Sequence, residues 1–291
     1  MKNLQKISRG ASIAIVAGAA SSAMADLSYT SFNSTAGMAL NGVAVQSAGL
    51  AGDPGDTLSL TPPAGNSAGS AWYTQQQPVA GGFTTQFQFR IRDKQGIGAD
   101  GLAFVIQTDP RGTTALGGQG GAMGFGTNPY FPTSPGPGIT SSVAIAFDTW
   151  DNTGDWPSLP GTNNIEVNTA PSPLLPNGPS TAYTIASGQA NGQFNDASVH
   201  TVRIVYSPGI LQVYYDSLVS PIVTAQLNLA TQLNLNNGSA YVGFTAATGG
   251  VQNEQRQEIL DWTMNSVIPA PSAGALIGLA GLCALRRRRS V

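Results

Sequence analysis

The chain has 291 residues, of which 36 are glycine, 19 are proline and only 10% are charged. This size and composition fit one large β-sandwich or two small domains with many turns, and argue against an architecture of long helices. Residues 26–268 hold all 15 acidic residues against six basic ones, a net charge of −9, which argues against nucleic acid as a partner.

The first 25 residues have the three parts of a secretory signal peptide. A basic start (Lys2, Lys6 and Arg9) precedes an apolar centre at residues 11–20 and the small-x-small site Ala23-Met24-Ala25. The apolar run is far short of the ~20 residues that a membrane-spanning helix needs, so an uncleaved anchor is disfavoured. We therefore expect export across the cytoplasmic membrane and a mature chain that begins at Asp26.

The next hundred residues alternate as strands do. Short alternating segments between residues 27 and 59 are broken by Asn41-Gly42 and Asp53-Pro54-Gly55, which are typical turn sequences. Every second residue from Phe83 to Ile91 is Phe, Thr or Ile, and the residues between them are polar or charged. This pattern predicts a strand with one buried face.

Two segments further along carry candidate ligand-binding residues. Residues 99–106 (ADGLAFVI) place Asp100 at the start of an apolar strand; the alternative is a turn aspartate that caps its own backbone. Residues 115–126 (ALGGQGGAMGFG) are rich in glycine, and a backbone N–H can approach a ligand closely where no Cβ intervenes. The alternative is a flexible loop without a ligand. A phosphate loop is excluded because no Gly-Lys-Ser/Thr follows.

Residues 143–168 combine a strand with a loop that is crowded with oxygen donors. Val143, Ile145 and Phe147 alternate with smaller or polar residues, as in a strand. The loop offers oxygens for a hard cation such as calcium, which takes roughly six to eight of them, from Asp148, the carbonyl of Trp150, Asn152 and Asp155. An EF-hand is excluded, since counting from Asp151 puts a tryptophan where its glycine belongs. A polar turn without a metal is the alternative.

These segments resemble, in order, the signatures of the L-type (legume-like) lectins. Residues 146–155 (AFDTWDNTGD) are similar to the family's metal loop, E-F-D-T-x-x-N-x-x-x-D, and residues 99–104 to its A-D-G-x-A-F motif. Residues 115–126 are similar to the family's glycine-rich G-G-x-x-G segment. Further matches are residues 165–168 (IEVN), 199–206 (VHTVRIVY), 240–250 (AYVGFTAATGG) and 259–264 (ILDWTM). The resemblance implies an all-β fold over residues 26–265, an antiparallel β-sandwich of the jelly-roll, concanavalin-like type.

The same resemblance implies a carbohydrate site organised by one calcium ion. Its calcium ligands would be Asp148, Trp150 through its carbonyl, Asn152 and Asp155. The sugar would contact Asp100, which follows a cis peptide bond in the family, Gly120 or Gly121, the ring of Trp150, and Asn152. Gly250 lies in the 249–255 loop, where the family varies its choice of sugar. The family's second, transition-metal ion is expected to be absent, because Ala146 and Thr162 replace its glutamate and histidine.

Catalysis is not supported by the sequence. A glycoside hydrolase needs two carboxylates that face the bond, but the E-x-D-x-x-E strand of such enzymes is absent and the three glutamates are scattered. The only histidine, His200, matches a structural strand position in the family. We therefore expect a non-enzymatic, calcium-dependent protein that binds cell-surface or extracellular-matrix polysaccharide. A calcium-stabilised matrix protein without glycan binding is the alternative, because the same residues serve both roles.

Residues 266–291 are predicted to be a separate tail. Pro269-Ala270-Pro271-Ser272 precedes an apolar run at residues 273–285 and four arginines at 286–289. This order resembles the PEP-CTERM sorting signal of exported bacterial proteins, with Ala270 in place of the glutamate. It implies transient membrane association, then processing by the export and sorting machinery; a short tail anchor is the alternative. The only cysteine, Cys283, lies here, so no intrachain disulfide can form.

Overall fold

The computed structural model describes residues 24–127, 137–150, 163–170 and 183–267. Most of the expected signal peptide, the sorting tail from residue 268 onward, and the proposed ligands Asn152 and Asp155 lie outside these ranges. In the described part, helix is limited to one four-residue α-helix, α1 (Leu229–Gln232), and two 3₁₀ turns, η1 (Gly112–Thr114) and η2 (Gly120–Ala122). Within the same ranges, no helix has the length and apolar character to cross a membrane.

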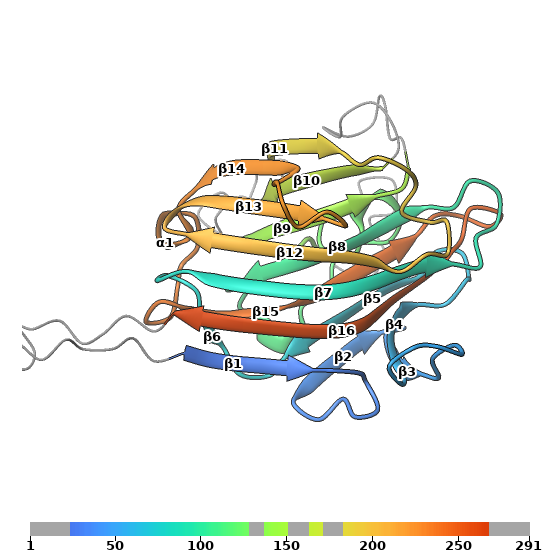
Figure 1. Ribbon diagram of the computed structural model, residues 1–291, viewed down its shortest axis with the longest axis horizontal. Coiled ribbons are helices and arrows are strands. Elements are labelled where there is room, and N and C mark those ends of the chain that lie inside the picture. Colours follow the sequence, from blue (N-terminus) through green and yellow to red (C-terminus); the bar gives the residue numbers. More distant parts are fainter. Residues whose placement is uncertain (1–23, 128–136, 151–162, 171–182, 268–291) are drawn as a thin grey trace, which may run out of the picture. The chain divides into compact units, whose positions relative to one another are not determined.

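The strands form two antiparallel sheets. The first sheet contains β1 (Met24–Tyr29), β3 (Val45–Ser47), β4 (Thr57–Thr61), β7 (Phe83–Arg92), β12 (His200–Ser207), β13 (Gly209–Tyr215), β14 (Val223–Leu227) and β16 (Arg256–Val267). The second contains β2 (Met38–Gly42), β5 (Ala68–Tyr73), β6 (Gln77–Pro78), β8 (Asp100–Gln107), β9 (Ser142–Asp148), β10 (Asn164–Thr169), β11 (Tyr183–Gln189) and β15 (Ser239–Thr248). Figure 1 shows the two sheets face to face, which confirms the predicted β-sandwich.

Strand order interleaves distant parts of the sequence. The first sheet runs β14-β13-β12-β7-β16-β4-β3, with β1 paired to β16, and the second runs β11-β10-β9-β8-β15-β5-β2, with β6 paired to β15. Neighbours in a sheet are therefore often far apart in the chain: β7 lies between β12 and β16, and β8 between β9 and β15. This arrangement brings the ends of β8 and β9 together, and with them Asp100 and Asp148.

The main core lies between the sheets and is built from large aromatic rings. Phe87 of β7 stacks on Phe104 of β8, with centroids 6.1 Å apart. Phe244 of β15 meets Trp262 of β16 edge-on at 5.0 Å. Every second residue of β7 faces this core, as the alternation predicts. Pairs of this kind add about 0.5–1.5 kcal/mol each beyond the burial of their area.

A second, smaller core covers the outer face of the second sheet. It consists of Trp72, Ala103, Val105, Ala115, Met123, Phe125, Ile139, Ala144 and Ala146. The segment between β8 and β9 supplies four of these residues. Two hydrogen bonds hold it on the sheet. The Trp72 indole donates to the Ala115 carbonyl at 2.8 Å, and the Thr245 hydroxyl donates to the Met123 carbonyl at 2.9 Å. Strands β8 and β9 are therefore buried on both faces.

Both ends of the sandwich extend slightly beyond the predicted domain limits. Strand β1 begins at Met24, and its residues Met24 and Ala25 pair with Val267 and Ser266 of β16. Cleavage after Ala25 would leave the strand from Asp26 onward, where the pairing continues from Asp26 with Asn265 to Tyr29 with Trp262.

Candidate functional site

The candidate site begins where β8 and β9 run side by side. Gly101 of β8 pairs with Asp148 of β9, so Asp100 lies opposite the start of the loop that follows β9. The Ala99–Asp100 peptide bond is cis, as the resemblance implied. The Asp100 carbonyl accepts two hydrogen bonds from Thr149, one from its N–H at 2.8 Å and one from its hydroxyl at 2.9 Å. Thr149 therefore fixes Asp100 against the end of β9.

A hollow of about 220 Å³ opens beside this junction and gathers most of the predicted sugar-binding residues. Its lining consists of Ala99, Asp100, Gly120, Gly121, Trp150, Gly249, Gly250 and Asn253. These residues come from four separate stretches of chain: the start of β8, the turn η2, the residue after Thr149, and the loop between β15 and β16. Of the predicted contacts only Asn152 cannot be placed, because it lies outside the described residues.

The Asp100 carboxyl lies in an unusual electrostatic environment. Its residue is 4% exposed, and its Oδ2 atom has no hydrogen-bond partner among the described residues. Burial raises the pKa of the Asp100 carboxyl to about 7, because the low-dielectric surroundings disfavour the charged form. A buried carboxylate oxygen without a partner is costly, and a bound hydroxyl group or a nearby cation would offset that cost. The alternative is a turn aspartate that caps its own backbone. Among the described residues, no backbone N–H donates a hydrogen bond to the Asp100 carboxyl, so this alternative is not supported.

The glycine-rich segment presents backbone rather than side chain to the hollow. Gly120 begins the turn η2 with a φ of 63°, a left-handed conformation that suits glycine. Among the described residues, no hydrogen bond from the N–H of Gly120 or Gly121 is found. Both glycines line the hollow, so both N–H groups remain candidate donors to a ligand.

The opposite wall is formed by the loop from Gly249 to Asn253. Ala99 holds this loop in both directions: its N–H donates to the Asn253 carbonyl at 2.8 Å, and its carbonyl accepts from the Gly249 N–H at 3.2 Å. A Cβ at Gly249 would lie 3.0 Å from the Ala99 Cβ and 3.4 Å from Asp100 Oδ2, whereas a Cβ at Gly250 would have no atom within 4 Å. The two neighbouring glycines therefore differ in how much space surrounds them.

This difference gives a stability prediction with an internal control. Gly249→Ala should be less stable than Gly250→Ala by about 1–3 kcal/mol, the typical cost of overpacking. Both changes reduce the entropy of the unfolded chain alike, so that contribution cancels. Thermal melts of the two variants decide the matter, and equal melting temperatures would contradict the packing described for Gly249.

Of the predicted metal ligands, only Asp148 and Trp150 lie among the described residues. Asp148 is buried at the end of β9, where its Oδ1 accepts a hydrogen bond from the Trp150 N–H at 2.9 Å and its carbonyl accepts from the Asn163 N–H at 2.8 Å. Trp150 is half-buried at the edge of the hollow. Ala146, which replaces the family's transition-metal glutamate, is buried in the second core. Within the described ranges, no cluster of three or more His, Cys, Asp or Glu residues could hold a metal.

A buried hydrogen-bonded chain behind the site was not anticipated from the sequence. The Gln255 side-chain amide donates to the Thr149 hydroxyl at 2.9 Å and accepts from the Asn195 amide at 3.1 Å. Asn195 also donates to the Ile97 carbonyl at 2.9 Å. These hydrogen bonds connect the loops that precede β8, β12 and β16, and they reach the Asp100 carbonyl through Thr149. Its members are 60 or more residues apart in pairs such as Asn195 and Gln255, so no local motif could have indicated it.

Two other candidate acids and bases, Glu258 and His200, have structural partners. Glu258 is fully buried and forms ion pairs with Arg90 at 2.9 Å and Arg92 at 2.8 Å. His200 lies 3.0 Å from the Asp216 carboxylate and 2.7 Å from the Tyr215 hydroxyl, both measured to its Nδ1. Neither residue lines the hollow. These contacts agree with the structural role expected of His200.

Three solved plant lectins show the same fold. A lectin from Bauhinia forficata in complex with GalNAc is 23% identical, with a TM-score of 0.64 over 85% of this chain and 100% of that one. Lectin I-B4 from Griffonia simplicifolia, in its metal-free form, is 24% identical, with a TM-score of 0.63 over 84% and 100%. Basic winged bean lectin with Tn-antigen is 25% identical, with a TM-score of 0.61 over 85% and 100%.

The family itself is identified by the sequence match. The model of the legume lectin β-barrel domain, the L-type lectin domain, matches residues 29–260, which include every described strand that lines the hollow. The expectation of a non-enzymatic protein agrees with this assignment. The chain belongs to the L-type lectin family, whose members are non-enzymatic carbohydrate-binding proteins.

Proposed function

We propose that this protein is an exported, calcium-dependent lectin that binds cell-surface or extracellular-matrix polysaccharide. The observation that carries the proposal is the Asp100 carboxyl, whose buried Oδ2 atom lacks a partner in the described structure and borders a glycine-lined hollow. A sugar hydroxyl is a hydrogen-bond donor that fits this acceptor. The N–H groups of Gly120 and Gly121 would donate in return, and the ring of Trp150 would pack on a sugar face.

The expected affinity for one sugar is low. Water competes for each of these hydrogen bonds, so a bond between neutral groups contributes only about 1 kcal/mol and one to the Asp100 carboxylate about 1.5–3 kcal/mol. A few such bonds give a dissociation constant near the millimolar range, or about −4 kcal/mol. Firm attachment to a polymer would then come from several copies that bind repeated sugars.

Calcium dependence is supported by the chemistry of the donor set. Asp148, the Trp150 carbonyl, Asn152 and Asp155 supply only oxygen, which suits a hard cation. Legume lectins typically bind calcium and manganese, but Ala146 offers no manganese ligand at its position, so one calcium per chain is proposed. Bound calcium supplies positive charge next to buried carboxylates and would lower the energetic cost of an ionised Asp100. The fold would hold the Asp100 carboxyl and the N–H groups of Gly120 and Gly121 at a fixed spacing for the sugar.

The single most informative experiment is a glycan array with the mature protein, run with calcium and with a chelator. Binding that appears only with calcium supports the proposal. Binding that the chelator leaves unchanged would contradict calcium dependence. A protein that binds no glycan under either condition, yet melts at a higher temperature with calcium, would instead be a calcium-stabilised matrix protein.

Export and maturation lead to a separate prediction. Ala23-Met24-Ala25 should be cleaved, so the mature protein should begin at Asp26, and processing of the tail should remove residues 286–289. Intact-mass spectrometry of the protein isolated from its native host measures both ends. An intact arginine run in that protein would contradict the sorting signal, whereas an intact N-terminus would contradict export.

A further inference from the structure

A second hollow, of about 170 Å³, lies next to the Thr149–Asp100 contact. It is lined by Lys94, Ile97, Thr149, Asn163, Gln193 and Asn195. Thr149 lines this hollow and Trp150 lines the first one; Ile97 lines this one and Ala99 the first. Ile97 and Ala99 are two residues apart, which is about 7 Å even along a fully extended chain. The lining residues of the two hollows are therefore separated by less than the length of a short oligosaccharide.

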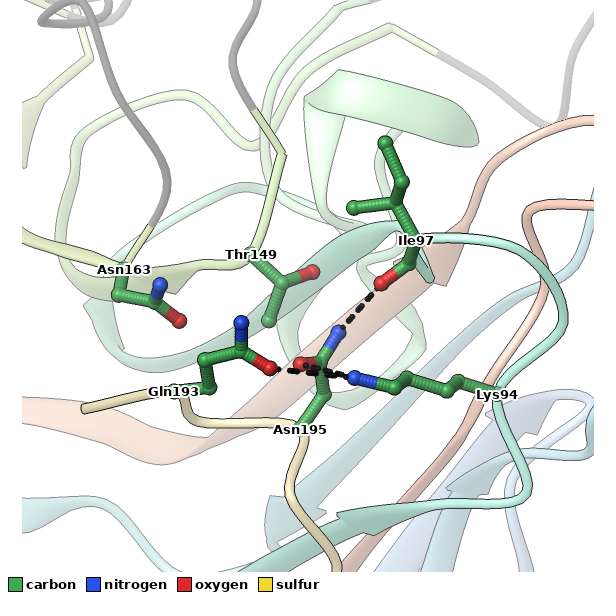
Figure 2. A pocket seen from close by; sticks show the side chains of 6 residues that line it. All are labelled: Lys94, Ile97, Thr149, Asn163, Gln193 and Asn195. Atoms are coloured by element: carbon green, nitrogen blue, oxygen red, sulfur yellow. Dashed lines mark hydrogen bonds between the residues drawn. The ribbon is translucent and has the colours of Figure 1, made fainter.

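The second hollow contains the Lys94 ammonium group, which forms no ion pair with a carboxylate of the described residues. The Lys94 Nζ donates to two neutral amide oxygens, Gln193 Oε1 at 3.2 Å and Asn195 Oδ1 at 3.3 Å. Figure 2 shows the Lys94 side chain directed toward these two residues, and the Asn195 amide nitrogen directed toward the Ile97 carbonyl. The neighbouring carboxylate of Asp93 is bonded to Arg92 and Arg256 instead.

This lack of neutralisation is unusual in so acidic a domain. Among the described residues, four of the six cationic side chains form ion pairs with carboxylates: Arg90, Arg92, Arg111 and Arg256. Arg203 lies over the Tyr214 ring at 4.4 Å and donates to the Leu218 carbonyl. Of these six described cationic residues, only Lys94 lines a hollow next to the candidate sugar site.

The remaining hydrogen-bonding capacity of the hollow is mostly that of donors. An ammonium has three N–H groups, and Lys94 uses two of them on amide oxygens. Gln193 is exposed, and its side-chain N–H₂ donates no hydrogen bond to another described residue. The Asn195 amide and the Thr149 hydroxyl are occupied by the buried chain to Gln255. A group that accepts hydrogen bonds and carries negative charge, as a carboxylate does, complements these donors.

We propose that the second hollow is a subsite for a carboxylate-bearing sugar, such as a uronic acid, of the same polysaccharide whose neighbouring sugar enters the first hollow. Lys94 pairs with the carboxylate, Gln193 donates a hydrogen bond to it, and Ile97 contacts the apolar part of the ring. The inference rests on the proposed lectin function. It narrows the ligand to acidic polysaccharides in which carboxylates are sparse enough to avoid repulsion by the net charge of −9 over residues 26–268.

The test is an array of uronic-acid oligosaccharides, each paired with its carboxyl-reduced, neutral counterpart, probed in calcium with the mature protein. For at least one pair, the wild type should bind the acidic member about fivefold more tightly, as expected for a partly exposed ion pair. Lys94→Gln should bind both members of that pair with the affinity that the wild type has for the neutral one. Lys94→Arg keeps the charge and should retain the preference. Higher salt should reduce the preference in the wild type.

The outcomes separate this inference from the proposed function. If the wild type binds both members of every pair equally and Asp100→Asn binds neither, the lectin site stands and the acidic subsite is wrong. A preference that persists in Lys94→Gln would also overturn the subsite. If the wild type binds no member of any pair nor any neutral glycan, the proposed function fails and this inference fails with it.

Discussion

Replacing Asp148 by alanine should lower calcium affinity, thermal stability and glycan binding together. The change removes a charged oxygen ligand from the proposed calcium site and one acceptor from the Trp150 N–H. Any ligand that binds only the folded state stabilises it, by about 2.7 kcal/mol at 100 times its dissociation constant. For a domain of this size, that loss corresponds to a fall in melting temperature of roughly 5–10 °C.

A second variant separates the ion from the local hydrogen bond. Asp148→Asn can still accept the hydrogen bond from Trp150 but lacks the charge, so its melting temperature should no longer respond to calcium or to a chelator. Calorimetry and elemental analysis after dialysis should find one calcium and no manganese or zinc per wild-type chain, and less than one calcium in either variant. Two metals per wild-type chain would show that the assignment of Ala146 and Thr162 is wrong.

The sandwich could be predicted from sequence because its strands carry strong local patterns. The alternation of Phe83 to Ile91 corresponds to β7, whose alternate residues face the core. The pattern in β9 conveys less, since both its large residues and its alanines are buried. Those alanines lie beneath the segment between β8 and β9, and they are small because that segment packs closely on the sheet. No rule of alternation distinguishes such a covered face from an exposed one.

The candidate site was accessible to sequence reasoning only through its motifs. Asp100, Gly121, Trp150 and Gly250 belong to four separate segments, and their order matches that of the family, so the resemblance brought them together. The supporting residues Asn195 and Gln255 lie in no such motif, and only the pairing of distant strands makes them neighbours. Lys94 likewise precedes the A-D-G motif by five residues, and its surroundings come from loops that are about 100 residues away.

Replacing Asp100 by asparagine should abolish glycan binding while calcium binding and the fold persist. The amide has nearly the same shape as the carboxyl group, and burial already disfavours the carboxylate's charge, so the fold should lose little stability. A hydrogen bond from a sugar hydroxyl to a carboxylate contributes more than one to a neutral acceptor. Its loss should therefore weaken binding by about 10- to 100-fold, which places a millimolar ligand beyond detection. Melting with calcium should match the wild type to within about 2 °C.

Trp150→Ala completes the comparison, because Trp150 lines the hollow and the change removes its ring while it retains the backbone carbonyl proposed to bind calcium. Calcium should then bind nearly as in the wild type, while sugar binding weakens by less than in Asp100→Asn. The three variants thus assign Asp148 to the ion, Asp100 to the sugar, and Trp150 to both through different atoms. If Asp100→Asn held the same glycans as tightly as the wild type, Asp100 would not be the sugar acceptor. The proposed sugar site would then lack its main hydrogen-bond acceptor. A calcium-stabilised matrix protein would be the better description of this protein.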